Sequence, residues 1–257
     1  MKAIWFGSIA FGLVNIPVKM YSASLPGRLD LDMLDSHDHS NIHFMRVNEK
    51  TGKEVKWENI VKGYKLPNDE YVVLDDKDFA KAAAEKNELI EIKEFTNEDA
   101  IDIIYYETPY YLLPAKNGER AYSLLREALM KTKKVGVATF VMRTKETLAI
   151  LKANKDVIVL DCLRFHEEVR SEKELDLPSK TEIKPAELKM AINLIESQTN
   201  KFDIVLYKNT YREQLMKLIQ AKAKGVKTKT TQLKVVHTKS QDLMSKLKAS
   251  IKHNKAA

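Results

Sequence analysis

Lys-Val-Gly-Val-Ala-Thr-Phe-Val-Met-Arg at residues 134–143 and Val-Ile-Val-Leu-Asp-Cys-Leu-Arg-Phe at residues 157–165 are the two stretches that decide the fold class of this chain. Both consist mainly of β-branched, aliphatic and aromatic residues, which favour strands. The segment Thr147–Leu151 between them has the same character. Short strands separated by turns are typical of a barrel or a sandwich rather than of a parallel α/β sheet.

Similar strands are predicted through most of the N-terminal two thirds of the chain. They are short apolar or alternating segments next to turn-forming residues: Ala3–Ile9, Leu13–Tyr21, Asn41–Val47, Glu54–Ile60, Tyr71–Leu74 and Leu89–Phe95. The tyrosine-rich stretch around Thr108-Pro109 predicts a further pair of strands. The fold is therefore expected to be mixed but mainly β.

Helices are predicted at a few places. Asp75–Ala84 has an aspartate cap and an alanine-rich interior, and Ala121–Lys131 places its apolar residues on one face. After Pro178 the composition changes, and Pro185 is expected in the first turn of a third helix. The Thr210-x-x-Glu213 pattern of a capping box begins a fourth, which Gly225 ends.

These patterns divide the chain into a β-rich body at residues 1–178, a helical arm at 179–225 and a basic tail at 226–257. From Lys217 onward there are 11 lysines and one acidic residue. Because the whole chain has a formal charge of +7, the residues before Lys217 carry −3. A lysine-rich arm attached to a slightly acidic body suits a polyanion such as nucleic acid. A merely solubilising tail is the alternative.

Composition excludes several classes of protein. The single cysteine, Cys162, rules out a disulfide framework and a cysteine-based metal cluster within the chain, and its apolar strand predicts a buried, unreactive thiol. No stretch has the ~20 apolar residues of a membrane-spanning helix. Gly7 and Gly12 have the spacing of a phosphate-binding loop, but Leu13-Val14 replaces its lysine and hydroxyl residue, which favours a strand–turn–strand.

One group of residues has the chemistry of a metal site. The group consists of a carboxylate and three imidazoles, which together can bind a divalent cation: Asp35, His37, His39 and His43. The neighbouring residues have a loop-like composition, which favours a site without a metal. A metal-dependent phosphodiesterase that uses these four residues remains open as an alternative, as does a protein-interaction module that touches nucleic acid only through its tail.

Several ordered motifs carry a resemblance to a known family. They are Ala3-Ile4-Trp5-x-Gly7-Ser8-Ile9-x-Phe11-Gly12-Leu13-Val14-Asn15-Ile16-Pro17-Val18-Lys19-x-Tyr21-Ser22-Ala23, Ile60-Val61-Lys62-Gly63-Tyr64, Tyr71-Val72-Val73-Leu74, Tyr122-x-Leu124-Leu125-Arg126-Glu127-Ala128-Leu129, Glu167-Glu168-Val169-Arg170 and Thr210-Tyr211-Arg212-Glu213. Over about residues 1–225 the chain resembles the bacterial Ku proteins of non-homologous end joining.

The resemblance implies a homodimer whose β-barrel cores and bridging segments form a ring around the end of a DNA duplex. Such proteins are not enzymes and need no cofactor. They hold broken double-stranded DNA ends and recruit an ATP-dependent DNA ligase during double-strand break repair. A cytoplasmic, nucleoid-associated protein without a membrane partner is therefore expected.

The same resemblance guides the choice of site residues. A ring that grips any sequence is expected to contact phosphates rather than base edges. The predicted DNA-binding residues are Lys19, Arg46, Lys50, Lys53, Lys65, Lys131, Lys133, Lys134, Arg143, Lys222, Lys224, Lys227 and Lys229, with Lys234 in the same tail. For Lys131–Lys134, compensation of a helix C-terminal dipole is an equal alternative. Leu215, Leu218 and Ile219 are the predicted ligase-docking residues.

One departure from the family pattern concerns metals. Many relatives have Cys-x-x-Cys where this chain has Asn48-Glu49-Lys50-Thr51. Thiol or thiolate–zinc chemistry is therefore impossible at this position, and no structural metal is predicted.

Overall fold

The computed structural model describes residues 1–83, 88–142, 145–178 and 183–226. The chain divides into two compact units, one ending at Glu174 and the other beginning at Leu175. The predicted basic tail lies outside the described residues except for its first residue, so the three-part organisation stays a prediction.

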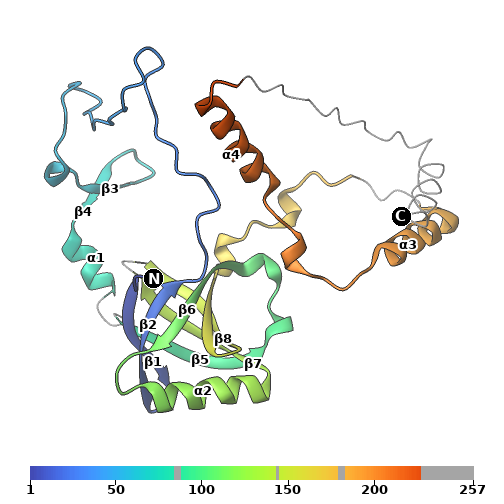
Figure 1. Cartoon of the computed structure of the whole chain (residues 1–257). Helices are drawn as coiled ribbons and strands as arrows, with labels where there is room; N and C mark the ends of the chain where they lie inside the picture. The colour runs from blue at the N-terminus through green and yellow to red at the C-terminus, as the bar shows by residue number, and fades with distance from the viewer. Residues whose placement is uncertain (84–87, 143–144, 179–182, 227–257) are drawn as a thin grey trace. The chain divides into compact units, whose positions relative to one another are not determined.

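Seven strands of the first unit close a barrel in the order β1-β2-β6-β9-β8-β7-β5 (Figure 1). They are β1 (Trp5–Phe11), β2 (Val14–Ser22), β5 (Leu89–Asn97), β6 (Tyr106–Pro114), β7 (Lys134–Met142), β8 (Lys145–Asn154) and β9 (Val157–Leu163). All neighbours are antiparallel except β1 and β5, whose parallel pairing closes the barrel. The expectation of a mainly β fold with a barrel core is confirmed.

Alternation along the strands fills the barrel with apolar side chains. In β2, Ile16, Val18 and Met20 are buried, while Lys19 between them is only partly buried. Successive strand residues point to opposite faces of a sheet, so a period of two puts the aliphatic residues inside. Lys19 therefore lies on the outer face of the barrel.

Helix α2 (Glu119–Thr132) packs against one end of the barrel (Figure 1). Its buried residues Tyr122, Leu125 and Leu129 belong to the same core cluster as the inward-facing strand residues. Their spacing of three and four residues places them on one helical face. The sequence predicts Leu125 and Leu129 on this face correctly, but Leu124, predicted on it as well, is 66% exposed. The helix ends at Thr132 and is capped by Lys133, which has a left-handed backbone with φ of 55°.

A second, smaller apolar cluster covers part of the outside of the barrel. Val135, Ile150 and Leu163 are buried there beneath Tyr105 and Tyr106. The predicted pair of strands in this tyrosine-rich stretch is wrong, because the 3₁₀ turn Ile103–Tyr105 (η3) is followed by the one strand β6. Pro109 does not end the strand; it lies at an irregularity in the pairing with β9.

Between β2 and α1 (Asp76–Ala83) the described chain has little regular structure. It contains the 3₁₀ turn Trp57–Asn59 (η1) and a two-stranded sheet of β3 (Lys62–Lys65) and β4 (Tyr71–Leu74). The strands predicted at Asn41–Val47 and Glu54–Ile60 are absent from this part of the chain that the structure describes. Each segment has a single bridge, Leu34 to Asn41 and Val47 to Glu54.

The tight turn between β1 and β2 contains Gly12, whose φ is +58°. Gly7 lies within β1, where an added Cβ atom would overlap Trp5 Cη2 and the Glu88 carbonyl oxygen. The two glycines thus serve a strand–turn–strand, which confirms the structural interpretation of their spacing.

The second unit contains α3 (Pro185–Gln198), the 3₁₀ turn Ile204–Leu206 (η6) and α4 (Thr210–Ala223). Pro185 begins α3 as predicted. The capping box at Thr210 is wrong, since the side chain of Asn209 caps α4 by accepting a hydrogen bond from the Arg212 amide. Gly225, with φ of +72°, follows the end of α4. None of the helices in the described ranges has the length and apolar character needed to cross a membrane.

Candidate nucleic-acid interface

Lys19 stands on the outer face of β2, opposite Phe6 of β1 and Leu113 of β6. Its ammonium nitrogen lies 5.9 Å from the centre of the Phe6 ring, a cation–π distance. Phe6 itself is 57% exposed. The charge of Lys19 is thus held at the barrel surface against an aromatic side chain, without an ion pair among the described residues.

Lys133 and Lys134 lie where α2 passes into β7, and together with Lys152 of β8 they line a pocket of about 260 Å³. The Lys134 ammonium donates to the side-chain oxygen of Asn97 at 2.6 Å, and Lys152 pairs with Glu98. Lys131 is exposed in the last turn of α2 and does not line this pocket. The cluster holds three ammonium groups and one carboxylate.

Sequence reasoning missed Lys152. The signal that identifies it is the alternation of β8, in which Ala149 and Leu151 belong to the core inside the barrel while Ile150 and Lys152 face outward. By itself, an outward-facing lysine two residues after Ile150 is only a weak indication of a binding site. Its proximity to Lys133 and Lys134 follows only from the strand register.

Arg46, Lys50 and Lys53 belong to one short hairpin. The Val55 amide donates to the Arg46 carbonyl at 2.7 Å, and the Asn48 amide donates to the Lys53 carbonyl at 2.9 Å. The Asn48 side-chain oxygen accepts hydrogen bonds from the amides of Lys50 and Thr51, both at 3.0 Å. The Asn48 side chain therefore shapes this loop.

Lys65 ends β3 and forms an exposed ion pair with Asp69 at 2.5 Å. Such surface ion pairs contribute about 1 kcal/mol or less to stability. Lys65 can therefore release Asp69 and bind a phosphate instead. On the same strand, the ammonium of Lys62 lies 4.5 Å from the centre of the Phe79 ring.

The remaining predicted residues fall in the second unit or outside the described residues. Lys222 is exposed near the end of α4 and Lys224 immediately follows the helix. On α4, Leu215 and Leu218 are half-buried and Ile219 is 38% exposed. The residues that lie outside the described ranges are Arg143, Lys227, Lys229 and Lys234.

The candidate metal ligands are arranged as parts of a turn. The Asp35 carboxylate accepts a hydrogen bond from the His37 amide at 2.8 Å and lies 2.9 Å from His37 Nδ1. These hydrogen bonds lower the pKa of Asp35. Within residues 1–83, 88–142, 145–178 and 183–226, no three His, Cys, Asp or Glu side chains form a group able to hold a metal ion.

Cys162 faces into the barrel from β9 and is 3% exposed. Burial raises the pKa of its thiol to about 12, with Glu107 and Asp161 adding to the effect. The predicted burial of the thiol is confirmed. Because the reactive species is the thiolate, the raised pKa favours the prediction that the thiol is unreactive.

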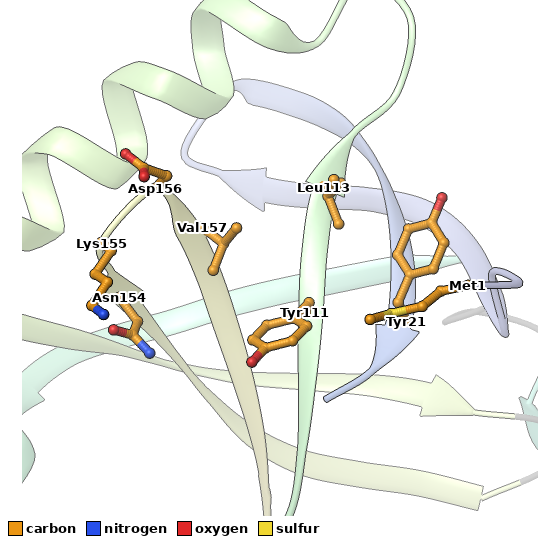
Figure 2. A pocket seen from close by; sticks show the side chains of 8 residues that line it. All are labelled: Met1, Tyr21, Tyr111, Leu113, Asn154, Lys155, Asp156 and Val157. Atoms are coloured by element: carbon orange, nitrogen blue, oxygen red, sulfur yellow. The ribbon is translucent and has the colours of Figure 1, made fainter. Parts of the chain in front are cut away.

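An apolar pocket of about 630 Å³ opens on the barrel surface where β2 and β6 approach the β8–β9 turn. Figure 2 shows Met1 and Tyr21 on one side, the Asn154–Val157 turn on the other, and Tyr111 and Leu113 between them. The lining residues are mainly apolar, and the turn supplies Lys155 and Asp156.

Comparison with known proteins agrees with this architecture. Residues 10–190 match the family model described as the Ku70/Ku80 beta-barrel domain. The chain is 39% identical to the non-homologous end joining protein Ku of Coxiella burnetii, over 97% of this chain and 94% of the relative. It is 41% identical to the Archaeoglobus fulgidus protein of that name, over 88% and 89%, and 38% identical to that of Bacillus subtilis, over 98% and 82%. A closed barrel and identities of this extent show that the chain belongs to the Ku family.

Proposed function

We propose that this protein binds the ends of double-stranded DNA without regard to sequence, as a homodimeric ring that acts in non-homologous end joining. The observation that carries the proposal is the similarity to non-homologous end joining Ku proteins over most of both chains. Proteins that are this similar over most of their length are expected to share the same task.

The barrel suits this task physically. Its interior is filled with aliphatic and aromatic residues, so DNA is expected to contact its outer surface. Basic residues stand on its outside, at Lys19 and at the Lys133, Lys134 and Lys152 cluster. A rigid scaffold with outward cations holds phosphates by charge and shape, which makes binding independent of sequence. The protein needs no cofactor for this task and is not an enzyme.

We propose further that α4 recruits an ATP-dependent DNA ligase. One face of α4 is apolar and consists of Leu215, Leu218 and Ile219. No residue of this helix is fully buried. A partly exposed apolar stripe on a helix is a common way to occupy a groove of a partner protein. Lys222 and Lys224 then strengthen the contact with DNA next to the docked ligase, and the protein is expected to associate with the nucleoid.

The decisive experiment compares linear duplex DNA with closed circles of the same sequence. The full chain is expected to retard the linear DNA and to leave relaxed closed circles free, and native mass is expected to give a dimer. Equal binding to both DNA forms, or a monomer in the presence of a blunt duplex, would overturn the ring. The assay includes Mn²⁺, because DNA cleavage that His37→Ala abolishes would instead support the phosphodiesterase alternative.

A further inference from the structure

Outside the barrel, the side chains of Arg46 and Trp57 form a cation–π pair. The centre of the Arg46 guanidinium lies 4.5 Å from the centre of the Trp57 ring, within cation–π range. The pairing follows from the backbone, because the 2.7 Å hydrogen bond from Val55 to Arg46 brings the two ends of the hairpin together. The η1 turn, closed by a 3.1 Å bond from the Ile60 amide to the Trp57 carbonyl, then fixes the position of Trp57.

Trp57 is nevertheless 71% exposed, so the guanidinium does not cover most of the ring. A tryptophan is usually among the more buried residues of a protein. An indole that carries a cation on one side and faces solvent on the rest is a stacking platform for another flat ring.

The charges around the platform favour a nucleic acid. Arg46, Lys50, Lys53 and Lys56 make no ion pair with any of the described residues. Glu49, Glu54 and Glu58 lie in the same stretch, so the hairpin is only slightly basic. A surface that binds several successive phosphates of a nucleic-acid backbone would carry more positive charge than this hairpin does. An aromatic ring with a few free cations is better matched to a base whose own phosphate is nearby.

We propose that the hairpin of residues 46–57 binds an unpaired nucleotide at a DNA end, with its base stacked on Trp57 and its phosphate held by the neighbouring lysines. The inference rests on the proposed function and adds a preference for ends with single-stranded overhangs. A flush duplex keeps its bases stacked on one another, whereas an overhang presents a base that is free to stack on protein.

Three DNA molecules that share the same duplex distinguish binding of the duplex, of the overhang backbone and of the overhang bases. One is blunt, one has a short 3′ overhang of thymidines, and one has an overhang of the same length made of abasic nucleotides. The wild-type full chain is expected to bind the thymidine overhang about 10-fold more tightly than the abasic one, as base stacking on an aromatic residue predicts. The thymidine overhang is also expected to quench tryptophan emission. Trp5 is the other tryptophan and packs on Phe140 within the barrel.

Trp57→Ala is expected to remove the difference between the thymidine and abasic overhangs and to leave the affinity for blunt DNA unchanged. Arg46→Lys keeps the charge but loses the flat guanidinium, and an intermediate loss is expected. Lys56→Gln is the matched control, since it removes a neighbouring charge without touching the ring and should weaken both overhangs equally.

Equal binding of the two overhangs by the wild type would overturn the inference and leave the proposed function intact. A lower native mass of Trp57→Ala would also overturn it, because Trp57 would then be part of the contact between subunits. Failure to bind any of the three DNA molecules would instead contradict the proposed function itself.

Discussion

The Tyr122 hydroxyl of α2 donates a 2.6 Å hydrogen bond to the carbonyl oxygen of Leu112 in β6. The hydroxyl oxygen of Tyr122 in turn accepts a 2.7 Å hydrogen bond from the amide of Ile158 in β9. Tyr122 is 4% exposed, and burial raises the pKa of its phenol. One side chain thus satisfies two backbone groups on adjacent strands and attaches the helix to the end of the barrel.

Tyr122→Phe is expected to destabilise the fold by about 1–3 kcal/mol, because it leaves a buried amide and a buried carbonyl without this partner. The measurement is equilibrium unfolding in urea, followed by circular dichroism. Tyr211→Phe, at a tyrosine that is 73% exposed, should change stability by less than about 0.5 kcal/mol. Equal stability of the two variants would show that Tyr122 acts only through its ring.

Gly7→Ala is expected to destabilise the barrel by about 1–3 kcal/mol or more, because the new methyl group would overlap the Trp5 ring and the Glu88 carbonyl oxygen. That carbonyl accepts a 2.8 Å hydrogen bond from the Ser8 amide, next to the parallel pairing that closes the barrel. Gly27→Ala is the matched control, since nothing lies within 4 Å of its added Cβ atom. A thermal unfolding midpoint that is the same for both variants would contradict the close packing at β1.

Cys162 is expected to resist a thiol reagent in the native protein. With a pKa of about 12, only about one thiol in 10⁴ is ionised at about pH 8, and the side chain is also buried. Labelling by a chromogenic disulfide should therefore be at least about 10³-fold slower than in concentrated guanidinium chloride. The denatured chain should then release one equivalent, as expected for its single cysteine. Rapid native labelling would mean that the barrel opens readily.

Asp161 on the outer face of β9 is expected to make stability depend on pH. Burial raises its pKa and Glu98 raises it further, whereas Lys152 lowers it. Because the folded state holds the proton more tightly than the unfolded state, stability falls as the pH rises from the ordinary aspartate value of about 4 through the raised pKa.

Asp161→Asn carries no charge at any pH and is therefore expected to be more stable than the wild type at neutral pH, with the advantage disappearing under acidic conditions. Urea unfolding at several pH values measures the difference, with exposed Asp30→Asn as the control. A variant that is less stable than the wild type at neutral pH would show that the attraction to Lys152 outweighs the cost of burial.

Lys19→Glu tests the placement of the DNA on the barrel surface. It is expected to weaken binding to duplex ends of all sequences alike, with little change in thermal stability, because Lys19 lies outside the core. In the wild type, a ring that contacts about six phosphates should give a slope near −5 for log affinity against log salt, and the variant a shallower one. Lys116→Glu, in the exposed loop before α2, is the charge-matched control. If both variants weakened DNA binding equally, Lys19 would not be part of the DNA interface.

Local patterns determined much of the fold. Runs of apolar, β-branched and aromatic residues predicted β1, β2, β7 and β9. Helical spacing predicted Leu125 and Leu129 on the buried face of α2, although Leu124, expected on the same face, is 66% exposed. The patterns failed at Asn41–Val47 and Glu54–Ile60, where apolar residues alternate without becoming strands. An alternating segment becomes a strand only if a partner lies beside it, and here each segment has a single bridge.

The sequence alone pointed to the family through its ordered motifs, and it predicted a mainly β body, a helical arm and a lysine-rich tail. Only the tertiary structure decided which distant residues meet. Lys152 reaches the Lys133 and Lys134 pocket through the β7–β8 register, Arg46 stacks on Trp57 through a hairpin, and Tyr122 finds partners in two strands. Composition and spacing indicate the chemistry that each residue can supply. The distances between residues are set when the barrel closes and the hairpin forms, and these distances decide which side chains are in contact.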